Sequence, residues 1–225
     1  MGNAINFRVN FMEVCANYYD DINYIIRRQL FANKNVQLEK LVSNYIYFYE
    51  HTIINKKEGD LIVTDQSIRI IWSVHKLHPV DYSRRKQVDS EWLINACLRQ
   101  YGFNGKIIKE IKREDLNSSK LKNGYVSFLK LCKKFPTKTI VPTPLQDFMW
   151  HSHMQDHLGY IEDTKNYLGR ILNHDDDIDP KLLEKYRKET EYLKKNVKYS
   201  FTGDSYCVTP VFYATCGSCS SCGGG

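Results

Sequence analysis

The most informative stretch of this sequence is residues 141–163, VPTPLQDFMWHSHMQDHLGYIED. It aligns without a gap on residues 63–85, VTDQSIRIIWSVHKLHPVDYSRR, when the chain is shifted by 78 positions. The residues that match are those expected to pack a helix-turn-helix unit: Val63 with Val141, Trp72 with Trp150, His75 with His153, and Tyr82 with Tyr160. A repeat of this length predicts two helical units that stack on each other.

The two copies differ at polar positions that the shared scaffold does not need. The first copy has Arg69, Ser73 and Arg85 where the second has Asp147, His151 and Asp163. We therefore interpret Trp150, His153 and Tyr160 as scaffold, and we place the candidate functional residues among those that only the second copy carries.

The hydrophobic pattern predicts an all-α protein, a helical bundle or array built from these two degenerate repeats. Apolar residues recur at helical spacing, and no segment alternates as a strand would. An N-cap at Asp65 or Ser67 begins a helix over IRIIWSVHKL, and residues 103–118 are ambiguous. The other expected helices span 11–32, 37–54, 80–100 (ended by YGFNGK), 121–135, 145–155, 157–172 and 180–197.

The expected organisation has five parts. An N-terminal helical segment covers 1–60, the first repeat 61–104, a basic connector with its helix 105–140, and the second repeat 141–200. The last part, 201–225, is a Gly/Ser/Cys tail. Its composition cannot build a packed core, so we predict that it is disordered.

Composition excludes a membrane protein and gives no sign of secretion. The chain is 42% hydrophobic and 26% charged, its apolar runs are short, and no basic segment followed by an apolar stretch opens it. Three of its seven cysteines (Cys15, Cys97 and Cys132) lie in apolar helical patterns. This pattern predicts reduced thiols and a cytoplasmic location.

The candidate site is a cluster of histidine and aspartate residues. On a helix over 145–155, Asp147 and His151 are i,i+4 neighbours, whereas His151 and His153 point in different directions. If the chain folds back after residue 157, Asp163 and His174–Asp175 approach that pair. Asp147, His151, Asp163 and His174 then form a general-base site, or His151, Asp163, His174 and Asp175 bind a divalent metal such as zinc. A purely structural hydrogen-bond network fits the same residues.

The second copy and its downstream segment resemble the glycine-rich domain-containing protein-like family. The resemblance is carried by Asp147, Trp150, His151, His153, Tyr160, Asp163, Gly169, His174, Asp175 and Asp176. The family's proline is replaced here by His157, while the first copy keeps Pro79. The resemblance extends over most of 60–225 and implies two such units with a cysteine- and glycine-rich tail. It implies no established reaction.

Two further segments have chemistry of their own. Cys207, Cys216, Cys219 and Cys222 in the tail are a second candidate zinc site, with a flexible, redox-sensitive tail as the alternative. Residues 105–138 carry ten Lys/Arg against three acidic residues, enough to contact nucleic acid, although a solvated helix face explains the same charge.

The function favoured by these features is a binding or scaffolding module that binds metal through the His/Asp cluster. Its partner would be a protein or a small molecule, and no membrane is involved. The alternative is a metal-dependent or His/Asp acid–base hydrolase, and a weaker one is nucleic-acid association through 105–138. Whether the chain is an enzyme stays open.

Overall fold

The computed structural model describes residues 5, 7–56, 61, 63–84 and 86–197. Within this part the chain is helical, without a strand, so the all-α prediction is confirmed. The Gly/Ser/Cys tail, 201–225, lies outside the described residues. The helices are α1 (Phe11–Arg27), α2 (Val36–Phe48), π-helix η1 (Tyr49–Ile53), α3 (Gln66–Lys76), α4 (Pro79–Ser83), α5 (Ser90–Glu110), 3-10 helix η3 (Arg113–Asn117), α6 (Ser119–Lys134), α7 (Pro144–Gln155), α8 (His157–Leu168) and α9 (Pro180–Asn196).

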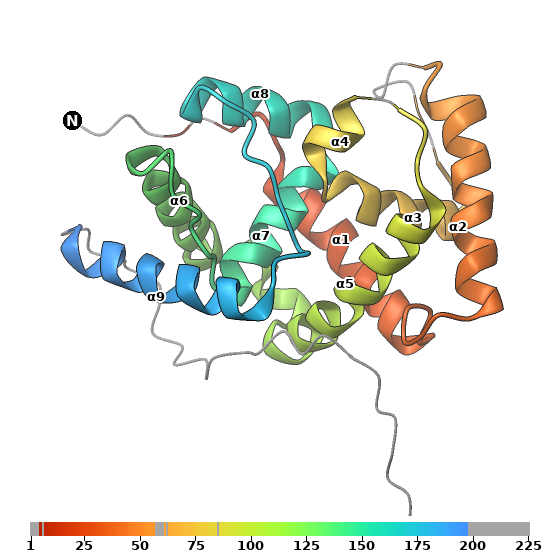
Figure 1. Ribbon diagram of the computed structural model, residues 1–225, viewed down its shortest axis with the longest axis horizontal. Helices are drawn as coiled ribbons and strands as arrows, with labels where there is room; N and C mark the ends of the chain where they lie inside the picture. The colour runs from red at the N-terminus through yellow and green to blue at the C-terminus, as the bar shows by residue number, and fades with distance from the viewer. Residues whose placement is uncertain (1–4, 6, 57–60, 62, 85, 198–225) are drawn as a thin grey trace, which may run out of the picture.

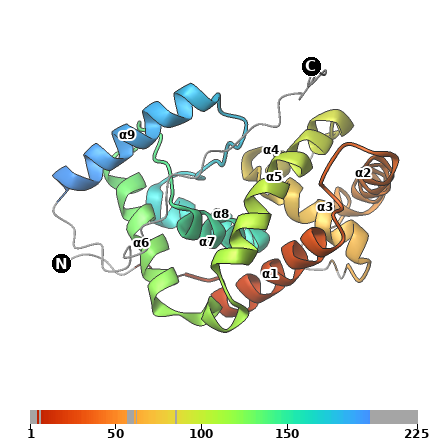
Figure 2. The same cartoon turned by 90° about the horizontal axis from the view of Figure 1, so that it is seen from below.

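Two hydrophobic cores share the long helices α1 and α5. One core joins them to α2 and α3, and the other joins them to α6, α7 and α8. Helix α1 contributes Ile25 to the first core and Ile22 to the second, while α5 contributes Leu93 and Phe103. Figure 1 shows α2 and α3 on one side of this pair and α6 and α9 on the other, and Figure 2 shows α2 and α9 at opposite ends.

The predicted helix over 80–100 is wrong in its bounds. The structure has a short helix, α4, and then a separate helix, α5, that begins after Asp89, whose side chain accepts a hydrogen bond from the Trp92 backbone. The two glycines expected to end it lie inside α5, which continues to Glu110. The low helix propensity of glycine does not end α5, because residues on both sides of the two glycines, such as Cys97 and Ile107, are buried in the two cores.

Strong local signals begin the helices around the candidate site. Thr143 and Gln146 form a reciprocal capping box before α7, with Pro144 in its first turn. Helix α8 ends at Gly169, which adopts the left-handed conformation with φ 74°. The predicted helix 157–172 is therefore too long, and the residues after Gly169 are free to run as an irregular segment.

The tryptophan of each matched stretch makes the same buried hydrogen bond. Trp72 Nε1 donates to the Tyr82 hydroxyl at 2.7 Å, and Trp150 Nε1 donates to the Tyr160 hydroxyl at 2.8 Å. Each bond satisfies an indole N–H that burial would otherwise leave unpaired.

The matched histidines also have equivalent surroundings. The Tyr45 hydroxyl of α2 lies 2.7 Å from His75 Nδ1, and the Tyr125 hydroxyl of α6 lies 2.9 Å from His153 Nδ1. Both histidines are buried. The contact at His75 joins α2 to α3, and the contact at His153 joins α6 to α7.

Gly159 in α8 is required by close packing. A Cβ at this position would lie 2.7 Å from Val9 Cγ2 and 2.8 Å from Asp156 Oδ2. We expect Gly159→Ala to lower the free energy of unfolding by about 1–3 kcal/mol, because overpacking outweighs the better helix propensity of alanine. Chemical denaturation measures this change. The control is Gly102→Ala in α5, where the new Cβ meets nothing within 4 Å and a gain of about 0.5–1 kcal/mol is expected; equal effects of the two substitutions would contradict the packing argument.

None of the helices in the described ranges combines the length and the apolar character that crossing a membrane requires.

Candidate metal centre

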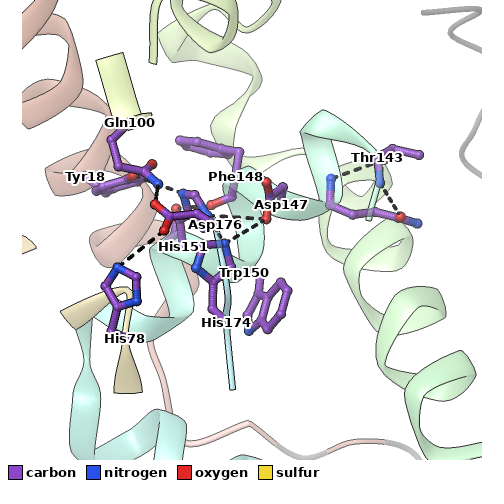
Figure 3. Close-up of polar contacts among 12 residues, drawn as sticks. Tyr18, His78, Gln100, Thr143, Asp147, Phe148, Trp150, His151, His174 and Asp176 are labelled. Atoms are coloured by element: carbon purple, nitrogen blue, oxygen red, sulfur yellow. Dashed lines mark hydrogen bonds and ion pairs between the residues drawn. The ribbon is translucent and has the colours of Figure 1, made fainter. Parts of the chain in front are cut away.

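Three side chains from two segments converge at the centre of the second unit. Asp147 and His151 lie one turn apart on α7, and His174 reaches them from the segment after α8 (Figure 3). His151 Nε2 lies 3.0 Å from His174 Nε2 and 3.3 Å from Asp147 Oδ1, and His174 Nε2 lies 3.8 Å from the same oxygen. One nitrogen or oxygen of each side chain therefore faces a common point.

These distances match the geometry of a tetrahedral metal site. Ligand atoms about 2.0–2.1 Å from a zinc ion at tetrahedral angles are separated from one another by about 3.3 Å. The three observed separations lie on both sides of that value. Among the described residues, this is the group of His, Cys, Asp and Glu side chains whose ligand atoms all approach within 4.8 Å.

The site is buried. The exposed fractions of Asp147, His151 and His174 are 4%, 1% and 6%. Burial and the neighbouring His151 lower the pKa of His174 to about 4, against the opposite effect of Asp147. His174 is therefore a neutral imidazole at physiological pH, which is the form that binds metal ions.

Aromatic residues orient the two imidazoles. The Tyr18 hydroxyl of α1 lies 3.2 Å from His151 Nδ1, and Phe103 of α5 packs against the same ring. When Nδ1–H donates to Tyr18, the lone pair of His151 Nε2 faces the shared point. Trp150 packs edge-to-face against His174 at 5.0 Å between ring centroids.

Asp163, a predicted catalytic and metal-binding residue, lies in a different network. Its Oδ2 is 3.1 Å from His153 Nε2, and both of its oxygens accept the Arg8 backbone N–H at 3.1 Å. The carboxylate thus bridges α8, α7 and the segment before α1. Fully buried and paired in this way, Asp163 supports the scaffold histidine and does not join the group around His151.

Asp175, the fourth predicted metal ligand, is exposed and is not part of the group. Its Oδ1 accepts the Asp177 backbone N–H at 3.0 Å. The inward residue is Asp176, which contacts Arg99 and Gln100 of α5. Asp176 belongs to the motif that carries the family resemblance, but the sequence predicts no role for it. The alternation that turns His174 and Asp176 inward and leaves Asp175 exposed follows from the extended conformation of the segment, which the sequence did not predict.

The remaining sequence candidates do not extend the site. Cys207, Cys216, Cys219 and Cys222 lie outside the described residues. In the basic segment 105–138, Arg113 pairs with Asp20 at 2.9 Å and Lys138 with Glu189 at 2.6 Å. Intramolecular ion pairs therefore neutralise part of the positive charge that would contact nucleic acid.

The first unit has different chemistry at the matched positions. Arg69, which aligns with Asp147, binds the buried carboxylate of Asp21 on α1 at 2.7 Å. Ser73, which aligns with His151, donates a hydrogen bond to the Ile70 carbonyl at 2.8 Å. The matched positions thus carry an ion pair and a backbone hydrogen bond in the first stretch, and two of the three clustered side chains in the second.

Comparison with known proteins gives a match over the middle of the chain. The model of the glycine-rich domain-containing protein-like (GRDP-like) family matches residues 83–163. This segment is similar to members of that family. The resemblance predicted from the motif is thereby confirmed over a shorter range than expected. The matched segment contains Asp147 and His151 and ends before His174.

Two curated relatives from Arabidopsis thaliana are similar to the chain. Glycine-rich domain-containing protein 2 is 28% identical over 102 residues, which are 44% of this chain and 13% of the relative. Glycine-rich domain-containing protein 1 is 28% identical over 88 residues, 37% of this chain and 11% of the relative. The chain thus corresponds to a small part of each relative's length. No solved structure matches it significantly.

Proposed function

We propose that this chain is a metal-binding module in which Asp147, His151 and His174 hold one divalent ion. The observation that carries the proposal is the convergence of His151 Nε2, His174 Nε2 and Asp147 Oδ1 at separations of 3.0, 3.3 and 3.8 Å. A GRDP-like segment without an established reaction is consistent with a binding or scaffolding role.

The ligand set favours zinc or a similar transition metal. Two imidazole nitrogens and one carboxylate oxygen are ligands typical of zinc, whereas calcium and magnesium select oxygen ligands. Tyr18 supports this choice, since zinc-binding histidines characteristically donate their second N–H to an oxygen.

The burial of the site favours a structural ion over a catalytic one. A hydrolytic metal centre keeps one coordination position that substrate can reach. Here the three residues are at most 6% exposed. The ion would instead join the segment after α8 to α7, so we place the hydrolase second.

Metal content of the purified chain tests the proposal. We expect about one zinc per chain in the wild type, and the same content in a variant truncated after Tyr206, which removes the four tail cysteines. Asp147→Asn and His174→Ala should lose the ion, since each removes one of only three protein ligands. His51→Ala, at an exposed histidine on η1, is the matched control and should keep it.

Three outcomes would contradict this site. If the wild-type chain is refolded with zinc and still holds no stoichiometric metal, the proposal is wrong. If the variant truncated after Tyr206 holds no metal, the ion is bound by the tail cysteines and not by this site. Metal that survives both Asp147→Asn and His174→Ala in folded protein shows that these residues are not the ligands.

A further inference from the structure

His174 lies on an extended segment that crosses the second unit between α8 and α9. Residues 171–179, which we call the strap, have no regular secondary structure. Burial alternates along its centre: Leu172 and His174 are buried, and Asn173 and Asp175 are exposed. This period of two is that of an extended chain, and it directs Asp176 inward with His174.

Asp176 attaches the strap to α5. Its Oδ2 accepts the Gln100 amide at 2.8 Å, and its Oδ1 accepts Arg99 Nε at 3.1 Å. His78 Nε2, from the turn before α4, lies 3.7 Å from the same Oδ1. Figure 3 shows Asp176 between Gln100, His78 and the histidine pair. The carboxylate is 9% exposed, so solvent screens these contacts weakly.

A second attachment lies on the other side of His174. The Tyr160 hydroxyl, which also accepts the Trp150 indole N–H, donates to the Leu172 carbonyl. His174 is thus held two residues after one anchor and two residues before the other. Of these anchors only Asp176 binds through its own side chain, so it can be removed by substitution without disturbing the scaffold pair Trp150–Tyr160.

We propose that Asp176 is a positioning residue that fixes the strap on α5, keeps His174 in its ligand position, and thereby controls entry and release of the metal ion. This inference rests on the proposed metal site. Asp176 is not a ligand itself. Because the three ligand side chains are buried, an ion reaches or leaves them when the strap lifts, and the contacts of Asp176 with Arg99 and Gln100 oppose that movement.

The expected effect follows from the general behaviour of groups that hold metal ligands in place. Removing such a group weakens metal affinity by about 10–100-fold. Here the loss should lie mostly in the release rate, since an unanchored strap opens more often while the three ligands stay the same. Rates of release carry most affinity differences between closely related binding sites.

Cobalt(II) binding compares Asp176→Ala with Asp175→Ala, its exposed neighbour in sequence. Cobalt gives a visible spectrum that reports its ligands, competition with a chromophoric chelator gives the affinity, and mixing with excess chelator gives the release rate. We expect Asp176→Ala to bind cobalt about 10–100-fold more weakly and to release it faster by a similar factor. Asp175→Ala should match the wild type, and Asp176→Asn, which can still accept from Gln100, should be intermediate.

Equal affinities and release rates for the wild type and Asp176→Ala would overturn the positioning role while leaving the metal site intact. Equal losses of cobalt affinity in Asp176→Ala and Asp175→Ala would overturn it too. They would show that the negative charge of the strap matters and that the contacts of Asp176 with α5 do not. If the wild type binds no cobalt, the metal site itself fails. Circular dichroism recognises a general folding defect in Asp176→Ala. In that case Gln100→Ala tests the same contact from α5. A wild-type rate of cobalt release in Gln100→Ala would overturn the proposal.

Discussion

Zinc added in large excess to the metal-free chain is expected to raise its thermal unfolding midpoint by roughly 8–16 °C. An ion that binds only the folded state stabilises it by about 4 kcal/mol at a free concentration 1,000 times its dissociation constant. For a chain of 225 residues, each kcal/mol shifts the midpoint by about 2–4 °C. Calorimetry or circular dichroism at increasing zinc measures the shift. The effect is large because the free zinc concentration far exceeds the dissociation constant.

Two aspartate variants separate binding at the site from general stabilisation by metal. Asp147→Asn keeps the shape of the side chain but loses the charged ligand, so its midpoint should not respond to zinc. Asp163→Asn weakens the buried network with His153 and should lower the midpoint without zinc. It should still show the wild-type increase with zinc, because Asp163 lies outside the site. A full zinc response in Asp147→Asn would contradict the assignment of the ligands.

Acid is expected to destabilise the protein through a buried histidine outside the candidate metal site. Burial lowers the pKa of His75 from 6.5 to about 3, with the nearby His78 and His157 adding to the effect. Below pH 6.5 the unfolded chain therefore binds a proton that the folded chain does not bind. The contribution of neutral His75 to the free energy of unfolding is fully present above pH 6.5 and is lost as the pH decreases toward 3. At about 1.4 kcal/mol for each pH unit, His75 alone accounts for roughly 3 kcal/mol between pH 6.5 and 4.

Denaturation at pH 7 and pH 4 measures this contribution. His75→Asn places an uncharged amide where Tyr45 contacts Nδ1, so the variant should be less stable at pH 7 but lose roughly 3 kcal/mol less than the wild type on acidification. His51→Asn, at an exposed position, should lose as much as the wild type. Parallel losses in all three proteins would show that His75 does not titrate differently in the folded and unfolded states.

Local sequence signals predicted most helices and their starts. Asp65, a predicted N-cap, accepts the first backbone N–H groups of α3, and Thr143 and Asp179 have the same role at the starts of α7 and α9. The error at 80–100 arose where local signals and packing disagree. The glycines that predict a helix end lie inside α5, because this helix contributes buried residues to both hydrophobic cores on either side of them.

Part of the candidate site follows from helix periodicity alone. Spacing of i,i+4 brings Asp147 and His151 together, and the same arithmetic separates His151 from His153. The course of the chain after Gly169 has no such periodicity. Sequence reasoning therefore grouped Asp163 and Asp175 with His174, whereas the structure pairs Asp163 with His153 and turns Asp175 to solvent.

Periodicity and capping are properties of neighbours along the chain, and so an all-α fold and the shared face of Asp147 and His151 can be deduced from the order of the residues. The position of His174 beside Asp147 and His151 depends on tertiary structure. It requires a left-handed glycine to end α8, an extended strap with every second residue inward, and a carboxylate two residues later that finds Arg99 and Gln100 on α5. Those partners are more than seventy positions away in sequence, and only the packing of α5 against the second unit brings them within hydrogen-bond distance.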